Sequence, residues 1–130
     1  MNLTVWMDSW QMECCGDPFR VGSRVSWTLV EANGEWLAAV LGSAAAAGVD
    51  AAEEHHGGAP EKTSPTSGTV TALSAVHCRY APLPGAKSGP RHPVPGSSTF
   101  TPLSAAARWT ADHGDLEFVG HLVGLDVPAR

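Results

Sequence analysis

Positive charge is scarce in this chain of 130 residues. Lysine and arginine together number 8, against 13 aspartate and glutamate residues, which gives a formal net charge of −5. A nucleic-acid-binding surface needs a basic stripe that neutralises phosphates, so this balance argues against a nucleic-acid partner. No apolar run approaches the roughly 18 residues that a membrane-spanning helix requires, and we expect no membrane partner.

Cysteine is also sparse, and the three cysteines are an odd number. An odd count does not suggest a framework of disulfides, and no charged-then-apolar leader opens the sequence. Both observations favour a protein of the reducing cytoplasm. We expect residues 1–130 to form a single domain, which at this length buries about two-thirds of its unfolded surface without help from a metal or disulfide.

The residues that are present predict a strand-rich fold. Apolar and polar residues alternate over several segments, as expected for half-buried strands. These segments are residues 3–12, 19–29, 69–80, 100–110 and 119–127. One parity of these strands predicts a shared core, which consists of Val25, Trp27, Leu29, Val70, Val76, Val123 and Leu125.

Apolar residues at helical spacing predict one inserted helix over residues 35–47. Asn33 is the expected cap, and Gly42 is a weak point within the helix. A short second helix is expected over residues 49–56. Four or five strands with an inserted helix predict an α+β fold, namely a small bent antiparallel sheet or a partly open SH3-like or OB-like barrel. Residues 81–99 are rich in proline and glycine and are predicted to form a flexible, irregular loop.

Cysteine and histidine occur as three adjacent pairs, which raises the hypothesis of a zinc site. The pairs are Cys14-Cys15, His55-His56 and His77-Cys78. Zinc takes about four thiolate or imidazole ligands in a tetrahedral arrangement. Neighbouring residues of a strand point to opposite faces, so each pair supplies one ligand unless it lies in a turn. The hypothesis therefore combines Cys14 or Cys15 with His55 or His56 and with Cys78.

A purely structural interpretation of the same residues is also open. Cys78 lies in the strand predicted over residues 69–80, where it is expected to be a buried small hydrophobe. His77 has the opposite parity and is expected to be partly exposed. His55 and His56 follow two glutamates at the end of the second predicted helix, where the helix dipole favours a cationic imidazole.

A cysteine-dependent enzyme is a further alternative. Cys15 precedes Gly16 in a predicted turn and would be accessible there. A nucleophilic thiolate needs a nearby base or positive field, whereas the acidic residues Asp8, Glu13 and Asp17 surround this turn. We therefore do not expect an enzyme.

Two tryptophans of the first predicted strand, Trp6 and Trp10, share one face. Such a pair can form a stacking platform on a small barrel. It can equally supply core area, because large aromatic residues are a main source of buried surface. Trp10 is the member that we expect to be exposed.

Several motifs along the chain together resemble one family. They are Trp10-Gln11, Cys14-Cys15-Gly16-Asp17-Pro18-Phe19, Val25-Ser26-Trp27, the segment 53–58, the segment 76–80 and the segment 120–126. The set spans nearly the whole chain and resembles a family of small uncharacterised actinobacterial proteins, a domain of unknown function. The resemblance implies an actinobacterial source and an intracellular single domain, and it carries no activity, ligand or catalytic residue.

The expected function is that of a non-catalytic accessory or interaction module whose partner is another protein, without a cofactor. A zinc-binding protein and a cysteine-dependent enzyme are the two alternatives.

Overall fold

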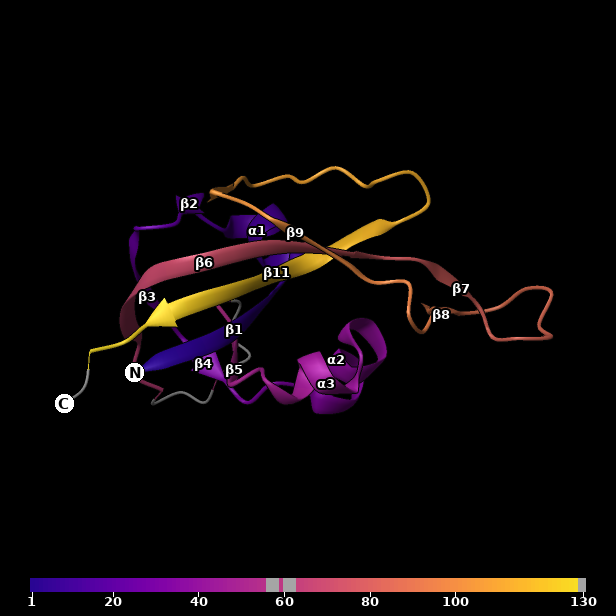
Figure 1. Cartoon of the computed structure of the whole chain (residues 1–130), viewed down its shortest axis with the longest axis horizontal. Helices are drawn as coiled ribbons and strands as arrows, with labels where there is room; N and C mark the ends of the chain where they lie inside the picture. Colours follow the sequence, from indigo (N-terminus) through magenta and orange to yellow (C-terminus); the bar gives the residue numbers. More distant parts are fainter. Residues whose placement is uncertain (56–58, 60–62, 129–130) are drawn as a thin grey trace.

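A computed structural model of the chain describes residues 1–55, 59 and 63–128, without the side chain of Cys15. This part forms short helices and strands around a bent sheet (Figure 1). The helices are α1 (Ser9–Cys15), α2 (Gly34–Leu41) and α3 (Ser43–Ala47). The strands are β1 (Asn2–Asp8), β2 (Phe19–Arg20), β3 (Arg24–Trp27), β4 (Leu29–Val30), β5 (Ala51–Glu53), β6 (Thr66–Cys78), β7 (Tyr80–Pro82), β8 (Arg91–Pro93), β9 (Thr99–Pro102), β10 (Ala105–Ala106) and β11 (Glu117–Asp126).

The main sheet has seven strands and is nearly closed into a barrel. Its order is β3-β6-β11-β1-β5-β4, and β9 pairs with β6 beside this path. The two end strands, β3 and β4, are separated in the chain only by Thr28, so one segment joins both edges. All pairs are antiparallel except the parallel pair of β1 and β5. The predicted α+β fold with a bent, partly open barrel and an inserted helix is confirmed.

Both faces of the central strands are covered, which creates two apolar cores. We call the first the barrel core; it contains Val5, Met7, Met12, Phe19, Val70, Leu73, Ala106, Val123 and Leu125. The second, the helix-side core, lies under α2 and contains Trp6, Leu37, Val40, Leu41, Val76, Cys78 and Val119. Consecutive strand residues point to opposite faces, so β1 supplies Val5 to one core and Trp6 to the other.

Two bulges between β6 and β11 change which residues share a face. The register shifts between Phe118 and Gly120 and again between Gly124 and Leu125. Because a bulge adds one residue to one strand, it reverses the alternation beyond it. The second shift lies between Val70 and Val76. Val70 therefore lies in the barrel core as predicted, whereas Val76 lies in the helix-side core. The prediction of a common core for these two valines is wrong for this reason.

The inserted helix forms where the sequence predicted it, but as two pieces. The side chain of Asn33 caps α2 by accepting a hydrogen bond from the Trp36 backbone N–H at 3.1 Å. Gly42 separates α2 from α3 with a φ of 88°, a conformation that glycine adopts readily. The local sequence predicted both the Asn33 cap and the interruption at Gly42.

Two other segments differ from the prediction. The strand expected over residues 3–12 ends at Asp8, and α1 follows and places Met12 in the barrel core. The helix expected over residues 49–56 is instead the strand β5, where Ala51 pairs with Val5 of β1. Pairing with β1 and β4 satisfies the backbone groups of β5, and such tertiary contacts override weak helix propensity. His56 lies outside the described residues.

The proline-rich segment 81–99 contains regular structure. Residues of β7 and β8 pair as a two-stranded ribbon that projects beyond the barrel (Figure 1). The Arg91 guanidinium donates to the Tyr80 carbonyl at 3.3 Å and pairs with the Glu117 carboxylate. The Ser98 hydroxyl donates to the Val40 carbonyl of α2. The exposed tip, residues 83–90, is the part without such contacts to the barrel in the described structure.

Candidate functional site

The candidate zinc ligands are distributed over different parts of the fold. Cys14 is exposed near the end of α1, and Cys78 is completely buried in the helix-side core. His55 follows β5, where its Nδ1 lies 2.6 Å from the Glu53 Oε1 atom. Among the described residues, no three histidine, cysteine or acidic side chains are grouped as a metal ion requires. Zinc binding that uses Cys15 or His56 stays a prediction, because this part of the site lies outside the description.

Cys78 is poorly suited to act as a nucleophile. Burial raises the pKa of its thiol, and the negative charge of Glu117 adds to this effect, while a hydrogen bond with Tyr80 opposes it. A raised pKa leaves little thiolate at neutral pH. Its packing beside Val76 matches the structural interpretation of this cysteine.

Two histidines, His77 and His121, are buried in the sheet. His77, expected to be partly exposed, is fully buried; its Nε2–H donates to the Ala111 carbonyl at 2.9 Å, and its ring stacks on His113 with centroids 3.7 Å apart. His121 is also fully buried, against Phe118 and Phe19. Burial, with a contribution from the nearby His77, lowers the pKa of His121 to about 4. His121 is therefore a neutral ring at neutral pH.

A groove with aromatic walls lies where the start of α1 meets α2, β7 and β11. Its volume is about 480 Å³, and we call it the aromatic groove. Its lining residues are Asp8, Ser9, Trp10, Asn33, Trp36, Tyr80, Glu117, Phe118 and Val119. Trp10 is 46% exposed, as expected.

Trp6 does not line this groove but packs behind it, against Trp36. Trp6 is only 2% exposed in the helix-side core, and its ring contacts that of Trp36 with centroids 5.7 Å apart. Its indole N–H donates to the Asp8 Oδ1 atom at 2.7 Å. Trp6 therefore orients one aromatic ring and one carboxylate of the groove, and the shared platform of Trp6 and Trp10 does not form because α1 begins between them.

The aromatic groove is acidic. Asp8 and Glu117 both line it, and their charges contribute, after burial and Cys78, to raising the pKa of Tyr80 to about 12. Arg91 of the ribbon contacts two of these residues: its guanidinium is 5.8 Å from the Tyr80 ring centroid and pairs with the Glu117 carboxylate. A cation held by one ring and one carboxylate is thus present at the edge of the groove.

A family model matches residues 1–127, which is almost the complete chain. The chain belongs to DUF6578, a family of unknown function. A search of curated proteins and a search of solved structures found no significant match. Membership in DUF6578 assigns no activity, so the function has to be argued from the geometry.

In this DUF6578 member, none of the helices within the described ranges is long and apolar enough to cross a membrane.

The sequence did not indicate that the groove residues other than Trp10 form a site. Trp36 had the spacing of a core-facing helical residue, and Tyr80 and Glu117 come from strand ends 37 positions apart in the chain. No local pattern links such positions, so only the paired strands bring them together.

Proposed function

We propose that this protein is a non-catalytic interaction module, and that its aromatic groove binds an arginine or lysine side chain of a partner protein. The single observation that carries the proposal is the placement of Arg91 against Tyr80 and Glu117. The groove continues from this pair to Trp10, Trp36 and the Asp8 carboxylate. A second cation can therefore contact an aromatic ring and a carboxylate further along the groove.

The physical basis is a combination of cation–π attraction and charge. A cation over an aromatic face gains about 0.5–1 kcal/mol at exposed sites and about 2 kcal/mol when it is desolvated. Trp10 and Trp36 offer such faces, and Asp8 offers a carboxylate whose geometry is held by Trp6. Tryptophan, tyrosine and arginine also dominate the energetics of protein interfaces. The net charge of −5 further favours encounter with a basic partner.

The proposal gives the cysteines no catalytic role. Burial and the raised pKa of Cys78 support this, because a raised pKa leaves little thiolate at neutral pH. A cytoplasmic location and an actinobacterial source belong to the same proposal, supported by the odd cysteine count and by the family resemblance.

The test uses a tripeptide with a central arginine, acetylated and amidated at its ends, and follows the indole N–H signals by NMR. We expect saturable shifts of the Trp10 and Trp36 signals that weaken with added salt. The same tripeptide with citrulline in place of arginine keeps the shape and removes the charge, and it should bind much more weakly. Equal binding of both peptides would refute the proposal.

Variants assign the binding to the groove. Trp10→Ala removes an aromatic wall, and Asp8→Asn removes a charge while it keeps an oxygen that accepts from Trp6. Both should weaken binding of the arginine peptide. Trp109→Ala is the matched control, because Trp109 is 68% exposed and lies outside the groove. If Trp109→Ala weakens binding as much as Trp10→Ala, the groove is not the site.

A further inference from the structure

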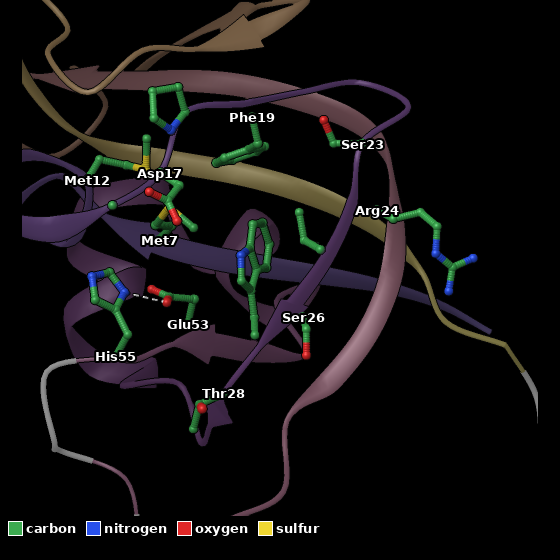
Figure 2. A pocket seen from close by; sticks show the side chains of 14 residues that line it. Met7, Met12, Asp17, Phe19, Ser23, Arg24, Ser26, Thr28, Glu53 and His55 are labelled. Atoms are coloured by element: carbon green, nitrogen blue, oxygen red, sulfur yellow. Dashed lines mark hydrogen bonds and ion pairs between the residues drawn. The ribbon is translucent and has the colours of Figure 1, made fainter.

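A second cavity opens into the barrel core, separate from the aromatic groove. Its volume is about 510 Å³, and residues of β1, α1, β2, β3 and the β5 end line it (Figure 2). We call it the barrel pocket. Pockets of about 300–1,000 Å³ accommodate small organic molecules. The barrel pocket and the aromatic groove share no lining residue.

One wall of the barrel pocket is apolar and largely aromatic. The Phe19 and Trp27 rings meet edge to face, with centroids 5.1 Å apart and an interplanar angle of 74°. Met7 and Met12 are buried members of the barrel core and complete this wall. Thioether and aromatic groups together form an adaptable surface for a ring or a branched alkyl group.

The opposite corner carries a buried carboxylate. The Glu53 side chain is only 4% exposed, and its Oε1 atom lies 2.6 Å from the His55 Nδ1 atom. Figure 2 shows Glu53 and His55 on the side of the pocket across from Phe19. Burial of a carboxylate is costly unless a partner compensates it, and His55 supplies such a contact. The pair holds a carboxyl group at the wall of the cavity.

The corner is supported by a second buried polar residue. Gln11 of α1 is 1% exposed; its amide N–H donates to Glu54 Oε2 at 3.1 Å, and its carbonyl oxygen accepts from the His55 backbone N–H at 3.4 Å. These bonds tie α1 to the segment after β5. The side chains that line the pocket corner are therefore held by the fold, as recognition of a small molecule requires.

We infer that the barrel pocket binds a small primary amine that carries an aromatic or branched apolar body. The apolar body packs against Phe19, Trp27 and the two methionines, and the ammonium group lies at Glu53. A carboxylate accepts about four hydrogen bonds, so the ammonium adds to the contacts that Glu53 already makes. The neighbouring aromatic faces also attract a cation.

The charges around the pocket favour an amine over an acid. Asp17 is a second carboxylate of the lining and points into the pocket in Figure 2, whereas the Arg24 guanidinium points away from it. An organic anion would be repelled by these two carboxylates, because like charges repel.

The experiment titrates the protein with 2-phenylethylamine, and separately with 2-phenylethanol and phenylacetate, and follows ¹H–¹⁵N NMR signals. We expect saturable shifts of the Trp27 indole N–H and the Glu53 backbone N–H with the amine. The alcohol should bind about tenfold more weakly, because it lacks the charge-assisted hydrogen bond, and phenylacetate should not bind. Absence of saturable shifts with the amine, or equal binding of all three compounds, would overturn the inference.

Glu53→Gln should weaken amine binding by about tenfold, and Glu31→Gln, at an exposed position outside the pocket, is the matched control. Amine binding that is unchanged in Glu53→Gln would also overturn the inference. If Glu53→Gln does not fold, the comparison of the three compounds on the unmodified protein decides. Trp10→Ala should leave amine binding intact, so failure here is distinguishable from failure of the aromatic groove.

Discussion

Acid should destabilise this protein through one buried imidazole, that of His121. The ring is fully buried between aromatic side chains, and neither of its nitrogens has a hydrogen-bond partner among the described residues. Burial, together with His77, lowers the pKa of His121 from its ordinary value of 6.5 to about 4. Between these two pH values the unfolded chain binds a proton at His121 that the folded chain does not bind. The free energy of unfolding therefore falls as the pH falls from 6.5 to about 4.

The size of the effect follows from the two pKa values. Each pKa unit is worth about 1.4 kcal/mol, so the full contribution of His121 is about 3 kcal/mol. The contribution is complete above pH 6.5 and is lost through the folded pKa of about 4. At pH 5 about 2 kcal/mol should already be lost. This is a large part of the 5–15 kcal/mol that typically separates folded from unfolded domains.

The assay is urea unfolding by circular dichroism at pH 7.5 and pH 5, with the wild type beside His121→Leu. Leucine has a comparable volume and cannot be protonated, so the variant lacks the contribution of this position. All other titrating groups are common to both proteins and cancel in the difference. Between pH 7.5 and pH 5, the free energy of unfolding of the wild type should fall by about 2 kcal/mol more than that of His121→Leu. A difference that is constant with pH would refute the assignment.

Three further predictions concern packing, the ribbon and the groove. Gly120→Ala should lower the urea midpoint, with a cost of about 1–3 kcal/mol, because the new Cβ would lie 2.5 Å from a ring carbon of Trp6. Gly34→Ala should not lower the midpoint, because its Cβ meets nothing within 4 Å and alanine is favoured over glycine in a helix. Replacement of residues 84–90 by a Gly-Ser linker should leave the melting temperature nearly unchanged, because the tip is exposed and loop closure entropy varies slowly with length. A collapse of the fold would show that this tip packs on the barrel. Arg91→Gln should strengthen binding of the arginine tripeptide in the NMR titration, because it removes a competing cation from Glu117 and Tyr80; weaker binding would contradict this competition.

The features that the sequence determined by itself are local ones. Alternation of apolar residues indicated most of the strands, and helical spacing located the helix of residues 34–47. Asn33 predicted the start of that helix and Gly42 its interruption, because capping and backbone freedom depend on a few adjacent residues. Acidic balance and the small number of cysteines also follow from composition alone. These properties need no knowledge of which strands pair.

The tertiary structure alone decided the features that depend on pairing. The bulge that sends Val70 and Val76 to different cores exists only where β6 pairs with β11. β5 is a strand because β1 and β4 lie on either side of it. His121 has the alternation of an ordinary strand residue, and its complete burial depends in part on Phe19, which is distant in the chain. Both cavities are likewise formed by segments far apart in sequence. Local periodicity reports the direction of a side chain relative to its neighbours, whereas burial and pocket shape depend on the elements that pack against it.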